Sequence, residues 1–288
     1  MREWRTGTTE LAPGVFAYVQ ATGGLCIANA GIIRERNGAT VIDALFTPSM
    51  TRALLDETYR VAPGAVGRLI STHHHVDHTL GNALFPASTR ILAHARAKEE
   101  MQRSGLSALP LIARLAPHFG PAIEDARERL PDQTFDAGAL DLDVDGRLVR
   151  LLHFGTGHTR GDVLVHLPEE RLLFAGDVAF FYVTPLAHEG HIGNWIRVVE
   201  RILELDGVDV IVPGHGPTGT KDELRDFAGY LRLIRERARA AFDAGVDARD
   251  AAASLEVGPY AEWGEPERTA INVARLYAEF RGELDALL

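Results

Sequence analysis

Short apolar runs separated by turn residues recur along most of the chain. Ile32 and Ile33 precede Asn37 and Gly38, and Val41 follows them; Asn-Gly favours the tight turn that joins two antiparallel strands. Further runs of strand type lie at 68–71, 148–152, 162–167, 171–175 and 208–212. The pattern therefore predicts one β-hairpin and several short, buried strands.

Helical patterns alternate with these strands. Thr47 followed by Pro48 predicts a helix that runs to about Arg60, because threonine caps a helix well and proline suits its first position. We expect Asn194 to cap another helix, whose apolar residues recur at helical spacing over 195–203. Strands and helices that alternate in this way are typical of an α/β sandwich.

The last quarter of the chain is helical in composition. Thr220 and Glu223 have the spacing of a capping box, which predicts a long helix and makes 220–288 a helical C-terminal part. Residues 97–130 are also helical in composition, but glycines and prolines break them into short pieces, so we expect a helical insertion that acts as a lid. No linker-like stretch divides the sequence, which predicts a single domain over 1–288.

Composition narrows the class of protein. The sequence has 30 basic and 40 acidic residues, for a net charge of −10, and no run of Lys or Arg, which argues against a nucleic-acid partner. No apolar run approaches the roughly 20 residues of a membrane span, and the first residues lack the apolar core of a secretory signal. We therefore expect no membrane association and a cytoplasmic location. Cys26 is the single cysteine, and its apolar neighbours predict a buried thiol.

The strongest chemical signal follows the strand predicted at 68–71. His73, His75, Asp77 and His78 lie within six consecutive residues. Burying so many polar groups without compensation is costly, and imidazole and carboxylate are ligands that zinc and neighbouring metals accept. The spacing therefore predicts a metal-binding loop, in which His73 and His75 face one ion while Asp77 and His78 reach a second.

Three further islands each place one ligand-type residue beside a glycine. His158 follows Gly157, Asp177 follows Gly176, and His215 lies between two glycines, each close to an apolar strand. Glycine lets the backbone approach an ion closely. The four islands together predict a metal centre and argue against a scaffold that has lost its metal.

In this order the islands resemble the metallo-β-lactamase-fold superfamily, which includes glyoxalase II, acyl-homoserine lactonases, zinc β-lactamases and persulfide dioxygenases. The resemblance implies a four-layer αββα sandwich of two mixed sheets flanked by helices. It also implies a dinuclear site in which Asp177 bridges the two ions. One ion would be held by His73, His75 and His158 and the other by Asp77, His78 and His215.

Two divalent ions can share a hydroxide near neutral pH and polarise a carbonyl. We therefore predict hydrolysis of an acyl bond, in a lactone, ester or thioester, by a metal-bridging hydroxide that Asp77 orients. Zinc is the expected metal, with iron or manganese as alternatives. Asp43 and Asp162 are candidate acceptors for the outer N–H groups of ligating histidines, although Asp162 is equally well placed to cap a turn.

The substrate is expected to be a small, partly hydrophobic molecule. The stretch that follows Asp177 predicts one wall of its pocket, with Phe180, Phe181, Tyr182, His188 and His191 as the candidate contacts. A role for the three aromatic residues in the core fits their composition as well. Apolar residues of the insertion point to the same substrate chemistry, namely Leu106, Leu109, Leu111, Ile112 and Leu115.

Other reactions remain open at this level. A mononuclear iron oxygenase of the persulfide dioxygenase kind uses one ion on the same histidine frame, and a dimetal phosphodiesterase uses a similar site. The acidic composition argues against a nucleic-acid substrate for the latter. The sequence also leaves open whether the chain forms a homodimer.

Overall fold

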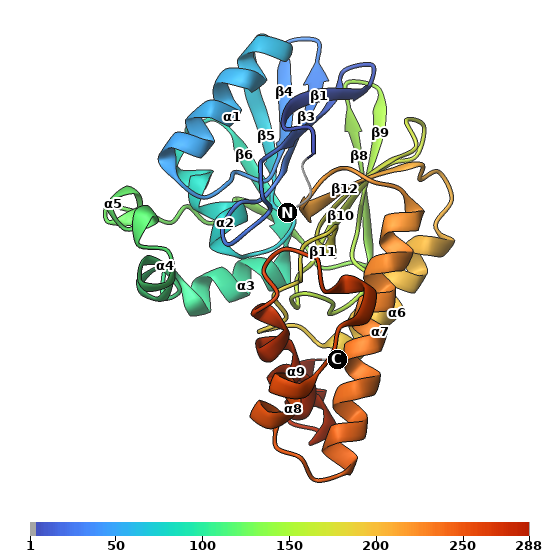
Figure 1. Ribbon diagram of the computed structural model, residues 1–288. Helices are drawn as coiled ribbons and strands as arrows, with labels where there is room; N and C mark the ends of the chain where they lie inside the picture. Colours follow the sequence, from blue (N-terminus) through green and yellow to red (C-terminus); the bar gives the residue numbers. More distant parts are fainter. Residues whose placement is uncertain (1–3, 288) are drawn as a thin grey trace.

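Two β-sheets pack face to face in the computed structural model, which describes residues 4–287 (Figure 1). The first sheet has seven strands in chain order. Its first four strands pair antiparallel, and the fourth to the seventh pair parallel. These strands are β1 Gly7–Ala12, β2 Val15–Val19, β3 Ala30–Glu35, β4 Gly38–Ile42, β5 Ala65–Ile70, β6 Arg90–His94 and β7 Gln133–Phe135.

The second sheet has five strands in the order β12-β11-β10-β9-β8. Only β11 and β12 run parallel; the other neighbours are antiparallel, so both sheets are mixed. The strands are β8 Ala139–Val144, β9 Arg147–Leu152, β10 Leu164–Leu167, β11 Leu172–Phe180 and β12 Val210–His215.

Helices cover both outer faces of the sheet pair. On one side α1 packs against the first sheet, and on the other α6 and α7 pack against the second; α9 packs against α7 (Figure 1). The α-helices are α1 Pro48–Val61, α2 Val76–Thr79, α3 Ala95–Ser104, α4 Leu109–Leu115, α5 Gly120–Ile123, α6 Ile192–Glu204, α7 Lys221–Asp243, α8 Ala248–Ser254 and α9 Arg268–Phe280. Short 3-10 helices span Leu80–Leu84, Pro117–Phe119, Gly258–Tyr260 and Asp285–Leu287.

Alternation along the strands explains the four layers. In β3, Ile33 faces the core between the sheets, while Ile32 faces the core under α1. In β4, Ile42 likewise faces the core between the sheets, and Val41 faces the core under α1. Successive side chains of a strand point to opposite faces, so a strand that is apolar on both faces needs a covering layer on each side. The four-layer αββα sandwich is thereby confirmed.

Several local predictions are confirmed. The Asn37 turn joins β3 to β4, with Glu35 paired to Gly38. The side chain of Thr47 caps α1, and Thr220 with Glu223 forms the capping box of α7.

Several boundaries differ from the prediction, and three of them bear on the site. Strand β12 spans Val210–His215 rather than 208–212, so it includes His215. Helix α6 begins at Ile192, and its N-cap is His191 rather than Asn194, because the ring Nδ1 of His191 accepts the Asn194 backbone N–H. Strand β11 does not end near residue 175. It continues to Phe180 alongside β12, which places Asp177 inside a strand rather than after one.

The segment 97–130 folds into short helices beside the metal-binding loop (Figure 1, green). Its Leu109 and Ile112 are buried in one cluster with Cys26 and Phe46. The insertion therefore has an apolar core contact of its own, and its action as a lid stays a prediction. Within residues 4–287, no helix combines the length and the apolar character needed to cross a bilayer.

The capping box of α7 offers a direct test of the local structure. Replacing Thr220 by alanine removes the side chain that accepts the Asp222 backbone N–H. We expect Thr220→Ala to lower the free energy of unfolding by about 1 kcal/mol. Chemical denaturation measures this loss, with Thr218→Ala, outside the box, as the control. Equal stability of the two variants would contradict the capping role.

Candidate metal centre

The seven predicted ligands come together at one end of the sandwich. His73 and His75 follow β5, and the short helix α2 carries Asp77 and His78. The second sheet supplies the rest: His158 lies beyond β9, Asp177 within β11 and His215 at the end of β12. Each sheet therefore contributes part of one polar cluster.

The first group of donor atoms comprises those of His73, His75, His158 and Asp177, all within 4.8 Å of one another. Nε2 of His158 lies 2.9 Å from Nδ1 of His75 and 3.2 Å from Oδ2 of Asp177. Nε2 of His73 lies 3.9 Å from the same Asp177 oxygen. Three nitrogens and one carboxylate oxygen thus surround a common point.

Asp77, His78 and His215 form the second group. Nε2 of His215 lies 3.3 Å from Oδ2 of Asp77 and 3.5 Å from Oδ2 of Asp177. Nε2 of His78 lies 3.0 Å from Oδ1 of Asp177. Asp177 therefore faces both groups, which is the placement expected of a bridging ligand.

Unsatisfied donor atoms show that the cluster fits metal ions. Nε2 of His73 is buried without a hydrogen bond among the described residues, and the 3.0 Å ion pair between Nε2 of His78 and Oδ1 of Asp177 lacks the geometry of a hydrogen bond. Leaving such atoms unpaired is costly, so an ion in the cluster would remove that cost. Donor atoms about 2.0 to 2.2 Å from a zinc ion stand roughly 3.3 Å apart in a tetrahedron. The contacts between Asp177 and the ligand nitrogens, which range from 3.0 to 3.9 Å, lie around that spacing.

Asp43 organises the ligands of the first sheet. It lies directly after β4 with φ at +61°, a conformation that costs energy for a residue other than glycine. Its carboxylate accepts the backbone N–H and the hydroxyl of Thr72, each at 2.8 Å, and contacts Nδ1 of His78 at 2.8 Å. The Thr72 hydroxyl in turn lies 3.1 Å from Nδ1 of His73. Asp43 therefore orients His78 directly and His73 through Thr72.

Backbone groups complete the second sheet's side of the centre. The Gly23 carbonyl lies 3.1 Å from Nδ1 of His215, so Nε2 of that ring faces the cluster. Gly214 allows the strand to pass close to Asp177, because a Cβ there would lie 1.9 Å from the Asp177 carboxylate. A side chain at Gly214 would therefore displace the proposed bridging ligand.

Two histidines of the first group are held neutral. Burial, reinforced by the nearby charge of His78, keeps the pKa of His73 well below its usual value. Burial likewise lowers the pKa of His158, and it outweighs the attraction of Asp177. Neutral imidazole is the form that binds a metal, so His73 and His158 release no proton when a metal binds.

The second group behaves differently. Burial alone would lower the pKa of His215, but Asp177 and Asp77 outweigh it and raise that pKa to about 9. The pKa of His78 is also raised well above its usual value, against burial, by Asp177 and Asp43. In the metal-free protein these rings carry protons that compete with a metal.

The structure places the predicted aromatic wall behind the ligands. Phe180 is only 1% exposed, and its ring stacks on His215 with centroids 5.1 Å apart and planes 4° apart. Phe181 is equally buried, and its backbone N–H donates to the His215 carbonyl at 3.1 Å. Phe180 ends a strand that is buried on both faces and Phe181 follows it, so both residues support the ligand rings from the core and do not line an open pocket.

The remaining pocket candidates, Tyr182, His188 and His191, differ in what they contact. The Tyr182 hydroxyl donates to Glu223 at 3.2 Å, and His191 caps α6, so both have structural partners. His188 stacks on His75 with ring centroids 4.9 Å apart, and its side chain is 41% exposed. Of these three residues, His188 is the one whose ring packs on a predicted ligand at the surface.

Asp162 does not contact a histidine ring with its carboxylate. It accepts the backbone N–H of Thr159 at 3.0 Å and the Thr159 hydroxyl at 2.6 Å, which caps the turn that carries His158. Turn capping is thus the alternative that the structure supports. Burial raises the pKa of Asp162 to about 7.

One polar residue beside the ligands has no signal in the sequence. Glu189 lies 2.9 Å from Nε2 of His74 and 3.2 Å from Nε2 of His75. It belongs to the loop between β11 and α6, and no spacing rule connects it to the histidine loop. The contact exists only because tertiary folding brings the two loops together.

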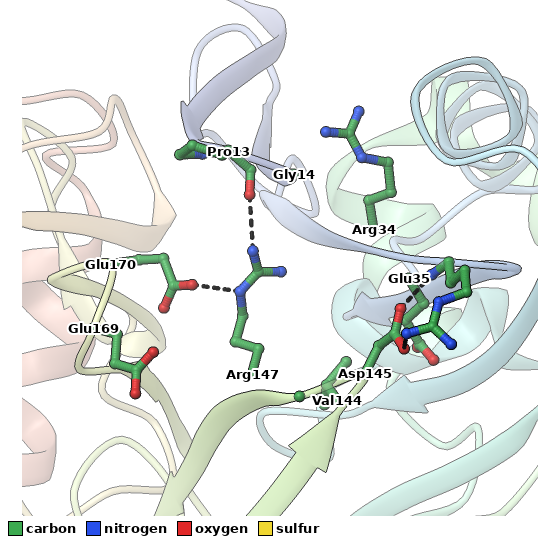
Figure 2. Close-up of a pocket in the computed structure, with 11 residues that line it drawn as sticks. Pro13, Gly14, Arg34, Glu35, Val144, Asp145, Arg147, Glu169 and Glu170 are labelled. Carbon is green, nitrogen blue, oxygen red and sulfur yellow. Dashed lines mark hydrogen bonds and ion pairs between the residues drawn. The ribbon is translucent and has the colours of Figure 1, made fainter.

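A depression at the opposite end of the sandwich is a weaker candidate site. It has a volume of about 590 Å³ and lies among strand-connecting turns. Figure 2 shows Arg147 between the Pro13 carbonyl and Glu170, and Arg36 contacts Asp145 at 3.4 Å. These arginines already have acceptors, and none of the metal-capable groups found within residues 4–287 lies in this depression.

Comparison with known proteins agrees with the fold. The family model of the metallo-beta-lactamase superfamily matches residues 23–215. The chain therefore belongs to this superfamily of metallo-hydrolases.

Relatives within the superfamily differ in their reactions. The chain is 28% identical over 243 residues to the 2,4-dinitroanisole O-demethylase subunit alpha of Nocardioides sp., covering 81% of this chain and 66% of that protein. It is 29% identical over 264 residues to a hydroxyacylglutathione hydrolase of Synechococcus sp., covering 85% of this chain and 91% of that protein.

Solved structures of low sequence identity share the fold. The sec-alkylsulfatase Pisa1 from Pseudomonas sp. matches with a TM-score of 0.76 at 19% identity, covering 96% of this chain and 50% of that one. The DIM-1 metallo-beta-lactamase matches with a TM-score of 0.59 at 19% identity, covering 78% of this chain and 96% of that one. This chain thus spans half the length of the alkylsulfatase.

Removing Asp177 tests the bridged arrangement. We expect Asp177→Ala to lower the metal content from about two ions per chain to one or fewer, because both ligand groups lose the carboxylate between them. Plasma mass spectrometry measures the metal, and circular dichroism checks that the fold persists. His74→Ala, which removes no predicted ligand, is expected to keep the full metal content. Full occupancy in Asp177→Ala would contradict the bridge.

The raised pKa values predict proton release on metal binding. His215, with a pKa of about 9, and His78 are protonated near pH 7 in the metal-free protein and must be neutral to coordinate. Zinc affinity is therefore expected to rise with pH until about pH 9 and to fall in acid. Calorimetry in buffers of different ionisation enthalpy counts the protons. Binding near neutral pH without proton release would be inconsistent with this assignment.

Proposed function

We propose that this chain is a dinuclear metal-dependent hydrolase that cleaves the acyl bond of a small lactone, ester or thioester. The observation that carries the proposal is the position of Asp177, whose Oδ1 lies 3.0 Å from His78 and whose Oδ2 lies 3.2 Å from His158. A carboxylate shared in this way suits two ions. In a single-iron oxygenase, the group of Asp77, His78 and His215 would hold no metal ion.

Asp77 is the proposed catalytic carboxylate. Two divalent ions, when bound, supply hydroxide near neutral pH and polarise a carbonyl; zinc is the proposed metal. Asp77 contacts His215 through Oδ2, and its side chain is 14% exposed, so it lies where a substrate would approach. Although burial would raise its pKa, His78 and His215 hold the pKa well below its usual value. Asp77 is therefore ionised, as a metal ligand must be, and its proposed part in moving a proton rests on its position beside His215 at the opening of the cluster.

Access to the cluster favours a substrate with an apolar portion. His75 and Asp77 are each 14% exposed, whereas the other five ligands are 4% exposed or less. Val76, between them, packs against the cluster of the insertion together with Leu25 and Leu106. An acyl chain would meet apolar side chains at this opening. Leu111 and Leu115 point instead to solvent, and Leu109 and Ile112 are core residues.

The relatives support an acyl substrate and name one alternative. Hydroxyacylglutathione hydrolases, by name, act on an acyl compound, and one of them matches most of this chain. The relative that covers 81% of the chain at 28% identity is an O-demethylase subunit, which makes cleavage of an aryl methyl ether a second candidate. Both reactions would use the same metal centre, so only the choice of substrate separates them. A panel that contains both kinds of substrate therefore distinguishes the two candidates.

Zinc-loaded protein should hydrolyse at least one member of a panel of lactones, thioesters and esters, and lose that activity on chelation. We expect Asp77→Asn to lower kcat by ~10²- to 10⁴-fold. Asp141→Asn, which alters an exposed ion pair with Arg150, is the matched control and should keep full activity.

The panel also contains a β-lactam and an aryl methyl ether. Cleavage of the ether alone would replace the acyl proposal by the second candidate. Failure of the two-metal protein on every acyl substrate would overturn the proposal in its present form.

A further inference from the structure

His75 differs from the other ligand histidines in the nitrogen that it presents. His73, His78, His158 and His215 face the cluster with Nε2. His75 faces it with Nδ1, which lies 2.9 Å from Nε2 of His158. A neutral imidazole that binds a metal through Nδ1 carries its hydrogen on Nε2, and that N–H needs an acceptor.

Glu189 supplies the acceptor. Its Oε2 lies 3.2 Å from Nε2 of His75, and the same oxygen lies 2.9 Å from Nε2 of His74. We propose that Glu189 is a positioning residue, which fixes the tautomer and orientation of His75 and so strengthens binding of the ion held by His73, His75 and His158. This inference rests on the proposed dimetal function. Carboxylates that accept from the outer nitrogen of a ligating histidine typically raise metal affinity.

The loop that carries Glu189 is anchored on both sides. Arg275 of α9 donates from Nε to the Gly190 carbonyl at 2.7 Å and from Nη2 to the Glu189 carbonyl. On the other side Gly190 lies against the turn of His158: a Cβ there would be 2.3 Å from the Gly157 carbonyl. The backbone of Glu189 is thus held between the C-terminal helices and a metal-ligand loop.

His188 completes the support of His75. Its ring stacks on that of His75 with planes 22° apart, so consecutive residues of one loop restrain the ring by its face and by its outer nitrogen. From its own loop, the rings of His73 and His74 also contact that of His75, with centroids 4.8 and 4.6 Å apart. Helix α9 therefore acts on the metal centre through Arg275 and Glu189, although it carries no predicted ligand.

A third metal site is the competing explanation. His74, His75 and Glu189 also place their donor atoms within 4.8 Å of one another. An ion there would need His75 to bind metals with both nitrogens, which requires removal of its last ring proton. A hydrogen bond to Glu189 requires no such loss, so we favour the positioning role.

Metal affinity measured without substrate tests the proposal. The full chain is stripped of metal, and zinc binding is followed by competition with a chromophoric chelator. We expect Glu189→Ala to lower the affinity for one of the two zinc ions by about 10- to 100-fold and to leave the affinity for the other unchanged. Glu189→Gln keeps an acceptor oxygen and should recover part of the loss, and Arg275→Ala should give a smaller loss at the same ion.

Glu283→Gln is the matched control. Glu283 lines the same surface depression as Glu189 but pairs with Arg281, so its substitution should leave both zinc affinities unchanged. Nitrogen chemical shifts of zinc-loaded protein provide a second readout: His75 should coordinate through Nδ1 and carry hydrogen on Nε2. The thermal midpoint of metal-free Glu189→Ala separates a folding defect from a loss of positioning.

Two results would overturn the inference. One is wild-type affinity for both ions in Glu189→Ala. The other is a third zinc ion in the wild-type chain that Glu189→Ala alone removes. Neither depends on turnover, so an absence of acyl hydrolysis would refute the proposed function and leave this test intact. If Glu189→Ala does not fold, the zinc affinities of Glu189→Gln and Arg275→Ala test the inference instead.

Discussion

The carboxylate of Asp43 is the contact on which the metal centre depends. It sits at the end of β4 in a backbone conformation that is costly for aspartate, and three hydrogen bonds within 2.8 Å hold it there. Those bonds fix Thr72 and His78, and through Thr72 they fix His73. Local strain is thus offset by bonds that orient two ligands, and the loop after β5 has a defined path toward the second sheet.

The centre closes across the interface between the two sheets. One sheet carries His73, His75, Asp77 and His78, and the other carries His158, Asp177 and His215. The apolar cluster between the sheets therefore sets the distance between the two halves of the site. Aromatic packing of Phe180 on His215 extends that support to the ligand rings. Binding of metal and packing of the sandwich are coupled, because each needs the sheets in the same relative position.

Much of this arrangement could be predicted from the sequence. Asn37-Gly38, the Thr47 cap and the Thr220 box act locally, so their effects follow from neighbouring residues. The ligand islands were identifiable because each joins a metal-binding side chain to a strand end or a glycine. Tertiary contacts were not identifiable in the same way. His191 caps α6 in place of Asn194, Asp162 binds Thr159, and β11 extends through Asp177 because β12 pairs with it. Glu189 contacts His75 from 114 residues away, which no local pattern encodes.

The central claim is that these side chains hold two ions with Asp177 between them. The most direct test is anomalous X-ray scattering at the zinc edge from crystals of the zinc-loaded protein. Two peaks are expected in each chain, one within coordination distance of His73, His75 and His158 and the other beside Asp77, His78 and His215. A single peak, or peaks only outside these two groups, would contradict the dinuclear centre.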